Sequence, residues 1–252
     1  MRILRNNTAI LGLAFQLFAA MVIAIQIYYL PFYFQSVLGR SATSSGILTL
    51  PFVMTLLLSP MIVGVMMTVY GHHITVMCVG ASMATAGSVL LSTLDVNSSF
   101  SQYIGYQFLA ALGVGIVQQI PFTSVPLALP PSDSATASAL VSFCNSLGPV
   151  IILTLGNVLF VNKLRQEVAQ IPGLDSNELK FNLVGMADLE KEVGLILLHS
   201  VRRAIGFALS RTLVLGIPCS ILALCCGIGI QCIAWRPTSI PSALSPDQRT
   251  GD

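Results

Sequence analysis

The chain has 252 residues, of which 54% are hydrophobic and only 9% charged, and its formal net charge is +2. A soluble domain carries roughly 25% charged residues, so these side chains cannot cover a water-facing surface and the apolar excess must face lipid. The small net charge and the lack of any run of Lys and Arg give no support to a nucleic-acid partner. The composition therefore predicts an integral membrane protein.

Six apolar stretches are long enough to cross a bilayer, since a helix needs about 20 apolar residues to span the hydrocarbon core. The first follows MRILRNN, and its apolar run to Phe34 is too long for a signal peptide. Short polar, glycine or proline breaks join the first five stretches, as expected between antiparallel helices. We predict an all-α protein with transmembrane helices at about 8–37, 46–69, 74–94, 103–127, 136–160 and 212–235.

The longest connection, 161–211, separates the fifth stretch from the sixth and begins with a polar segment that contains a Pro172-Gly173 turn. From about Asp188 it has a Leu/Ile/Val stripe, with acidic residues first and basic residues last, as the helix dipole favours. We expect an amphipathic helix here that lies on the membrane interface and leads into the sixth span. A polar tail follows over 236–252.

Six spans place both termini on the same side of the membrane, but the basic residues do not fix which side. The side of the termini holds four Arg residues, whereas the other side holds Arg40 and the seven bases of 161–211. That long connection also holds six acidic residues, and most of its bases lie away from a span. The positive-inside rule, which counts bases close to spans, is therefore inconclusive.

Reactive side chains are missing from the predicted hydrocarbon cores, which contain no Asp, Glu, Lys, Arg or His. This argues against an intramembrane enzyme, which needs a nucleophile with a base or a metal with its ligands. His72 and His73 are adjacent in a turn and point apart, so we expect neither a metal site nor a cofactor. The six cysteines lie in apolar stretches and are typical of packing residues, with palmitoylation of Cys232 as the alternative.

Uncharged polar side chains concentrate in the first and fourth spans. Amides left unpaired in lipid are costly, so they should face other helices or a wet cavity. Hydrogen bonds between helices explain part of the set, and the concentration in two spans favours a cavity for the rest. The polar set includes Gln16, Tyr28, Tyr106 and Asn157, and the candidate cavity residues are Gln26, Tyr29, Gln35, Gln107, Gln118, Gln119 and Asn145.

A short pattern occurs twice in the chain. SATSSGILTL at 41–50 and SATASALVSF at 134–143 each follow an apolar run with a Pro-Phe pair near its end, LPFYFQ from Leu30 and IPFTSV from Ile120. The pattern maps the first span onto the fourth and the second onto the fifth. Because an offset of three helices reverses the orientation, we predict a three-plus-three inverted repeat, the unit of transporter halves, with a substrate site at the repeat interface. Candidate positions for helix bending during gating are Pro31, Pro121 and Pro126.

The stretch IYYLPFYFQSVLGRSATSSGILTLPF at 27–52 resembles fungal members of the major facilitator superfamily. It is similar to the first helix of the C-terminal six-helix domain in the fourteen-span drug:proton antiporter branch, and 103–121, 129–148 and 162–175 continue the resemblance in the same order. The resemblance implies cytoplasmic termini, an extracellular long connection and a central cavity lined by the first and fourth helices. It marks as cavity or gate positions Tyr29, Gln35, Gln107, Gln118 and Gln119.

The resemblance also implies export of small, often hydrophobic molecules such as drugs, toxins or secondary metabolites, coupled to proton entry, usually at the plasma membrane. That branch has two six-helix domains and two linking helices, and this chain resembles one domain. We therefore expect a carrier half that works with a second copy or with a missing N-terminal half, or else a non-transporting fragment or regulatory partner of a full-length carrier. Of the two glycosylation sequons, at Asn6 and Asn97 on opposite sides of the membrane, we predict modification at Asn97.

Overall fold

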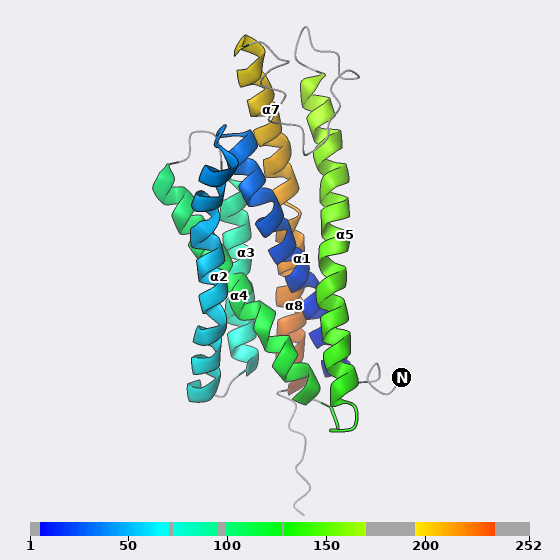
Figure 1. Ribbon diagram of the computed structural model, residues 1–252. Coiled ribbons are helices and arrows are strands. Elements are labelled where there is room, and N and C mark those ends of the chain that lie inside the picture. The colour runs from blue at the N-terminus through cyan, green and yellow to red at the C-terminus, as the bar shows by residue number, and fades with distance from the viewer. Residues whose placement is uncertain (1–5, 71–72, 95–98, 128, 170–194, 235–252) are drawn as a thin grey trace, which may run out of the picture.

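The computed structural model describes residues 6–70, 73–94, 99–127, 129–169 and 195–234, which form long helices and no strand within those ranges (Figure 1). The helices are α1 (Asn7–Ser36), α2 (Ala42–Tyr70), α3 (His73–Ser92), α4 (Phe100–Leu127), α5 (Ser134–Val168), α7 (Leu195–Leu213) and α8 (Gly216–Ala234).

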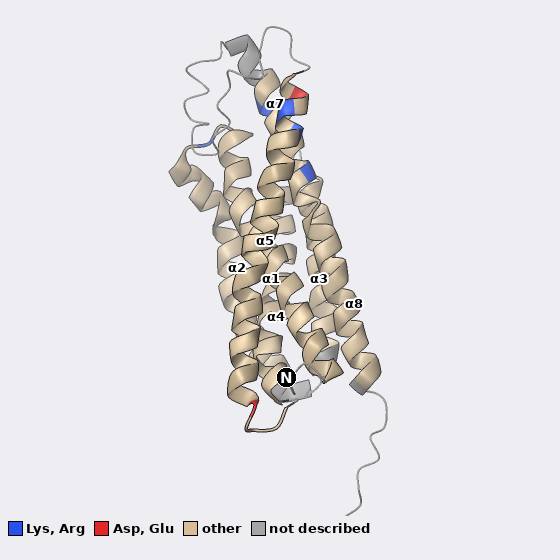
Figure 2. Cartoon of the chain, turned by 90° about the vertical axis from the view of Figure 1, so that its right-hand side faces the viewer, with Lys and Arg blue, Asp and Glu red and all other residues tan. Residues whose placement is uncertain are grey.

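The helices form two exchangeable triplets, one of α1, α2 and α3 and the other of α4, α5 and the α7–α8 pair. α1 packs extensively against α5 and α8 of the other triplet, and α4 packs in the same way against α2 and α3. The helices α1 and α4 meet each other, and so do α3 and α8. Exchanging α1, α2 and α3 with α4, α5 and the α7–α8 pair therefore reproduces the pattern of contacts, which confirms the predicted three-plus-three arrangement. Figures 1 and 2 show α3 and α8 together on one side of the bundle.

Six helical stretches are long and apolar enough to cross a membrane, and they account for nearly all of the described chain. The sixth is built from α7 and α8 together and runs from Ser200 to Ile233. Within the described ranges, Lys, Arg, Asp and Glu gather at the two ends of the bundle and leave its long middle uncharged (Figure 2). The prediction of an integral, multi-pass membrane protein is confirmed.

The connection between the fifth and sixth spans differs from the expectation at both of its described ends. The helix α5 continues to Val168 instead of ending near 160, and α7 stands along the bundle in line with α8 instead of lying on the interface (Figure 1). The apolar stripe of α7 packs against the other helices: Val201, Ile205 and Leu209 are buried, and the helix contacts mainly α5. The region from 188 to 194, where the amphipathic helix was expected to begin, lies outside the described residues.

The junction between α7 and α8 lies just before a proline, Pro218. Pro218 has no N–H, and its ring clashes with the carbonyl group four residues earlier, which disfavours a continuous helix through this point. The chain closes α7 with a tight turn in which the N–H of Leu215 bonds to the carbonyl oxygen of Thr212 at 3.0 Å. α8 then begins at Gly216, with Pro218 in its first turn, where the missing donor costs little.

The turn between α1 and α2 depends on Gly39, which has a φ of +60°. This left-handed conformation is easily adopted only by glycine. A Cβ atom at Gly39 would also lie 2.6 Å from Nη2 of Arg202, because the guanidinium group of α7 rests on this turn. After the turn, the side chain of Ser41 accepts the N–H of Ser44 at 3.3 Å and caps the start of α2.

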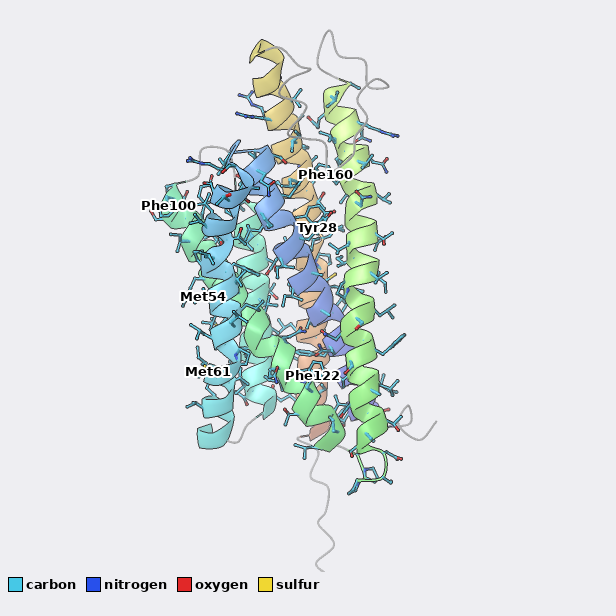
Figure 3. The ribbon with its side chains drawn as sticks, in the orientation of Figure 1. Tyr28, Met54, Met61, Phe100, Phe122 and Phe160 are labelled. Carbon is cyan, nitrogen blue, oxygen red and sulfur yellow. The ribbon has the colours of Figure 1, made fainter. Side chains whose placement is uncertain are left out.

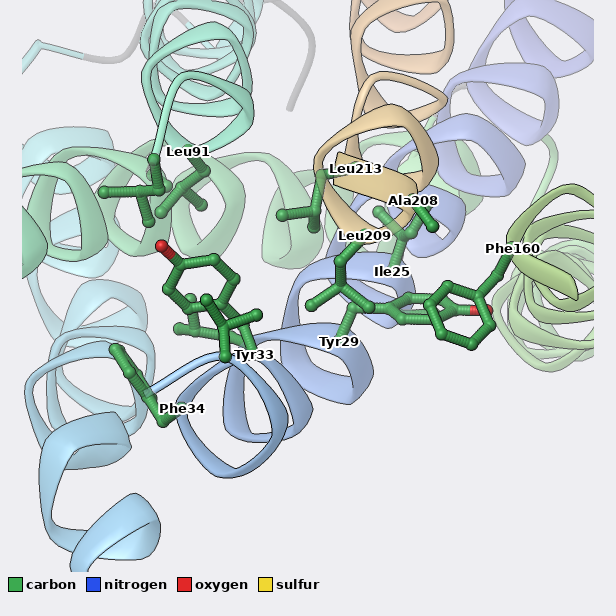
Figure 4. Packing of buried hydrophobic residues seen from close by; sticks show 14 of the residues in the cluster. Ile25, Tyr29, Tyr33, Phe34, Leu91, Phe160, Ala208, Leu209 and Leu213 are labelled. Carbon is green, nitrogen blue, oxygen red and sulfur yellow. The ribbon is translucent and has the colours of Figure 1, made fainter. Parts of the chain in front are cut away.

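The helices approach each other closely where glycine meets a neighbouring backbone. A Cβ atom at Gly113 of α4 would lie 2.6 Å from the carbonyl carbon of Met83 on α3, and one at Gly87 of α3 would lie 2.7 Å from Cβ of Ala110 on α4. Such small-residue contacts replace the hydrophobic driving force that helices lack among lipid tails. Around them, larger buried side chains from α1, α3, α5 and α7 fill the core, including Tyr29, Tyr33 and Phe160 (Figure 4).

Candidate functional site

The two helices of the predicted cavity are the most enclosed parts of the bundle. In the most apolar window of each helix, 61% of α1 and 56% of α4 are buried, against 28% of α2 and 22% of α5. α2 and α5 therefore form the edges of a face whose centre belongs to α1 and α4. Figure 3 shows Tyr28 and Phe122 in the middle of this face, between α2 on one side and α5 on the other. We call it the front face.

Three amides from α1, α4 and α5 meet in one hydrogen-bonded cluster. The Nε2 atom of Gln16 donates to Oδ1 of Asn145 at 3.0 Å, and Nε2 of Gln118 donates to the same oxygen atom. Gln16 is fully buried, whereas Gln118 and Asn145 are half-buried. This amide cluster brings together two of the predicted cavity residues, Gln118 of α4 and Asn145 of α5, which are 27 residues apart in sequence.

The amide cluster leaves acceptors without a partner. The Oε1 atoms of Gln16 and Gln118 are buried and accept no hydrogen bond. A buried amide oxygen that has lost water without gaining a donor costs free energy, on the order of 1–3 kcal/mol. A cluster that served only to join helices would be expected to satisfy both ends of its amides, so these two oxygen atoms are unusual.

α1 and α5 also meet through an aromatic cluster, at the end of their contact opposite the amide cluster. The ring of Phe160 lies 5.6 Å from that of Phe32, edge to face, and 6.5 Å from that of Tyr29, while Tyr28 and Tyr29 stack edge to face at 5.1 Å. Edge-to-face pairs of this kind stabilise aromatic packing beyond simple burial. Tyr28 is exposed, so the cluster reaches the front face through this ring (Figure 3).

Tyr29 itself is buried inside that cluster. Its hydroxyl group has no hydrogen-bond partner, and a Cβ atom at Gly156 of α5 would lie 3.0 Å from its oxygen atom. The glycine therefore provides the room in which the tyrosine ring fits against α5. Of the predicted cavity residues, Tyr29 is a core side chain in this structure (Figure 4).

Two more of the predicted residues lie inside the bundle. Gln26 is 2% exposed, and its Nε2 atom donates to Oγ of Ser88 on α3 at 2.9 Å, toward the side opposite the front face. Gln107 of α4 is fully buried, and neither its Nε2 nor its Oε1 atom has a partner. The structure thus gives these glutamines protein surroundings, although their chemistry is the same as that of Gln118.

Gln35 and Gln119 are exposed. Gln35 lies at the end of α1, seven residues after Tyr28, and so it shares a helix face with that ring. Gln119 precedes Phe122 by three residues and shares its face of α4, which Figure 3 places in the middle of the bundle. Both side chains therefore lie near the front face but outside the amide and aromatic clusters.

The residues that join these clusters were only partly visible in the sequence. Gln16 belonged to the polar set of the first span but was not among the candidate cavity residues, and Ser88 and Phe160 carried no signal. Phe160 is one aromatic residue in an apolar span, and Ser88 lies in a segment rich in Ala, Ser and Gly, which suggests packing. Only the contacts reveal that each of them joins a predicted residue.

The three prolines proposed as bending points lie within continuous helices, Pro31 in α1 and Pro121 and Pro126 in α4. Each proline removes one N–H donor from its helix. The carbonyl group of Pro31 accepts the hydroxyl hydrogen of Ser45 on α2 at 2.8 Å and so joins the two helices. Bending at these positions stays a prediction, and the proposed glycosylation site, Asn97, lies outside the described residues.

The chemistry of the front face is that of uncharged hydrogen bonding and apolar contact. No group of three His, Cys, Asp or Glu side chains within the described ranges is arranged to hold a metal ion. The ionisable acids of the same ranges, Asp133 and Glu167, lie at opposite ends of α5. The arrangement fits a surface that binds an uncharged, largely apolar molecule.

Comparison with known proteins assigns the family. The sequence model of the Major Facilitator Superfamily matches residues 1–163, which is more than half of the chain. The chain belongs to the major facilitator superfamily. The match covers α1 to α4 and nearly all of α5. Every residue of the amide cluster and of the aromatic cluster therefore lies inside the matched region.

Its curated relatives are fungal transporters. The chain is 31% identical over 225 residues to "Efflux pump roqT" of Penicillium rubens, which covers 89% of the chain and 41% of that protein. It is 34% identical over 198 residues to "MFS-type transporter astH" of Aspergillus oryzae (78% and 35%), and 34% identical over 194 residues to "Aspyridones efflux protein" of Neocamarosporium betae (77% and 34%). The chain therefore spans less than half the length of these superfamily members.

Proposed function

We propose that this chain is the C-terminal half of a membrane carrier that exports small hydrophobic molecules. The observation that carries the proposal is the front face, where amides and aromatic rings from α1, α4 and α5 meet in surroundings without charge. The names of the superfamily relatives, two of which are efflux proteins, support export as the direction of transport. Drugs, toxins and secondary metabolites are the substrate class, and the plasma membrane is the proposed location.

Coupling to proton entry is part of the same proposal. The described spans of this chain hold no carboxylate between their ends, so a proton-carrying group would have to lie in the other half of the carrier. In this arrangement, the chain supplies substrate contacts and the moving helices, and the partner half supplies the titrating group.

The front face also suggests where the partner half docks. The two helices at its edges expose large apolar side chains, among them Met54 and Met61 on α2 (Figure 3) and Phe143 and Val150 on α5. Alternating access requires a second bundle that rocks against the first around a shared site. We therefore place a missing N-terminal half, or a second copy of this chain, on the front face.

A second function is favoured by the length comparison: the chain is a non-transporting fragment or a regulatory partner of a full-length carrier. It spans 34–41% of the length of the three relatives named above, and one bundle alone cannot alternate access. This alternative predicts that affinity-tagged chain captures a full-length carrier from co-expressing cells and lowers or alters that carrier's export.

The experiment that separates export by two copies of this chain from the non-transporting alternative is accumulation of a neutral fluorescent compound, Nile red, in cells that express the chain. Export predicts lower accumulation than in cells with an empty vector, and reversal of this effect by Gln118→Ala. Gln26→Leu is the matched control, because Gln26 bonds to α3 and lies away from the front face. Equal accumulation with and without the chain would contradict export by the chain alone. An effect lost equally in both variants would contradict the assignment of the site.

A further inference from the structure

We propose that the amide cluster holds Asn145 as a fixed hydrogen-bond donor for the carbonyl oxygen of an uncharged substrate. This inference rests on the proposed binding function of the front face and names the chemistry that the site recognises. Gln16 and Gln118 are positioning residues in this scheme, and Asn145 is the residue that touches the ligand.

The first step is the orientation of the Asn145 side chain. An asparagine amide has one oxygen atom with two acceptor positions and one NH2 group with two donors. Both acceptor positions are occupied, since Gln16 from α1 and Gln118 from α4 donate to Oδ1. Because the two ends of an amide point apart, the NH2 group of Asn145 faces away from both glutamines. Rotating the Asn145 amide alone, with both glutamines in place, would break both hydrogen bonds.

The second step is the availability of that NH2 group. Among the hydrogen bonds of the described residues, Nδ2 of Asn145 donates to no acceptor, and the side chain is half-buried rather than enclosed. A donor in these surroundings is poorly hydrated, so an acceptor supplied by a ligand binds it more strongly than it would in water. The site therefore selects molecules with an acceptor oxygen atom.

The third step is the apolar wall beside the amide cluster. Leu13, Phe122 and Val141 belong to one packed cluster, in which Phe122 is partly buried. Each of them lies one helical turn from a member of the amide cluster, from Gln16, Gln118 and Asn145 respectively, and so on the same face of its helix. A ligand bound to the NH2 group of Asn145 would thus rest its body against hydrocarbon, which fits an apolar molecule with one carbonyl group.

The fourth step is charge. On α5, the nearest described charged residues are Asp133 and Lys163, which lie 12 and 18 residues from Asn145. At a rise of 1.5 Å per residue these positions are about 18 and 27 Å away along the helix. Among the described residues, a carboxylate or ammonium group on the ligand would therefore find no counter-ion beside Asn145, and burying an unpaired charge is far more costly than burying a neutral carbonyl group. The ligand class is uncharged.

The test uses two probes that share one ring skeleton, 9-fluorenone with its carbonyl group and fluorene without it. Equilibrium binding of each probe is measured on the full chain in phosphatidylcholine nanodiscs, after subtraction of partitioning into empty discs. We expect fluorenone to bind about five- to tenfold more tightly than fluorene, as one net hydrogen bond provides. Asn145→Leu should remove this preference. Asn157→Leu, on an exposed position of the same helix, is the matched control and should retain it.

A second measurement on the unaltered chain keeps the test informative if Asn145→Leu fails to fold. The infrared carbonyl band of bound fluorenone should lie at lower frequency than the band of fluorenone in lipid, because an accepted hydrogen bond weakens the C=O bond. Gln16→Leu releases one restraint on the Asn145 amide and should reduce the band shift while the protein stays folded. An unshifted band in the unaltered chain would overturn the proposal.

The outcomes also separate this inference from the proposed function. Equal, saturable binding of fluorenone and fluorene would leave the binding face intact and overturn the donor role of Asn145. A preference for fluorenone that survives Asn145→Leu in a folded protein would overturn it as well. Absence of saturable binding for both probes would overturn the donor role together with the binding function of the face.

Discussion

The close contact between α3 and α4 leads to a sharp prediction about Gly113. A methyl group at this position would lie 2.6 Å from the carbonyl carbon of Met83 and would also overlap the backbone nitrogen of Ala84. Carbon atoms prefer separations of about 3.5–4.0 Å, so Gly113→Ala must push the two helices apart by about 1 Å. Overpacking of this kind costs about 1–3 kcal/mol, and backbone atoms cannot rotate away from the clash as a flexible side chain would.

The matched control is Gly105→Ala on the same helix, where an added Cβ meets nothing within 4 Å. There the substitution changes only helix propensity, which favours Ala over Gly by about 1 kcal/mol. Because both variants gain this propensity, we expect them to differ by the clash cost of about 1–3 kcal/mol in unfolding free energy, with Gly113→Ala the less stable. The assay is unfolding by sodium dodecyl sulfate in mixed micelles, followed by circular dichroism. Equal stability of the two variants would refute the close approach of α3 and α4.

Two further predictions concern a buried hydrogen bond and the orientation of the chain. Ser88→Ala leaves Nε2 of Gln26 without an acceptor and should lower the unfolding free energy by about 1 kcal/mol, whereas adding Gln26→Leu should remove much of that penalty. Additive losses in this double-mutant cycle would contradict the pairing. For orientation, Asn97→Gln should abolish the mobility shift produced by peptide N-glycosidase, and Asn6→Gln should not, since Asn6 caps α1 by accepting the N–H of Thr8 at 3.0 Å. A shift that depends on Asn6 alone would reverse the predicted topology.

The order and approximate bounds of the membrane helices were predictable from the sequence because apolar length is the dominant signal in a bilayer. The pairing of the triplets was also predictable, since the Pro-Phe and Ser-Ala-Thr pattern fixes which helices are counterparts. The side of each helix that faces protein was not. Most of these helices are apolar all round, so periodicity does not distinguish an exposed residue such as Met61 from a core residue such as Ile25.

The same limit explains the mixed placement of the polar residues. Gln26 and Gln118 look alike in sequence, yet one bonds to α3 inside the bundle and the other joins the amide cluster near the front face. In lipid, an amide that meets another helix and an amide that meets a cavity are both shielded from hydrocarbon, so composition cannot separate them. Gln16 and Asn145 lie 129 residues apart, and only the packing of α1 on α5 brings them together.

The repeat also shows how one scaffold produces a face with two different ends. Tyr28 and Gln118 each lie three residues before a Pro-Phe pair, so they hold equivalent positions in the two triplets. Inversion places them toward opposite ends of the bundle: Gln118 lies beside Gln16, which is 12 residues, or about 18 Å, from Tyr28 along α1. An aromatic ring at one end and an amide at the other would hold an elongated, uncharged molecule in a single direction. The inverted repeat would itself provide the asymmetry that orients such a ligand, because its two copies carry different side chains at this one position.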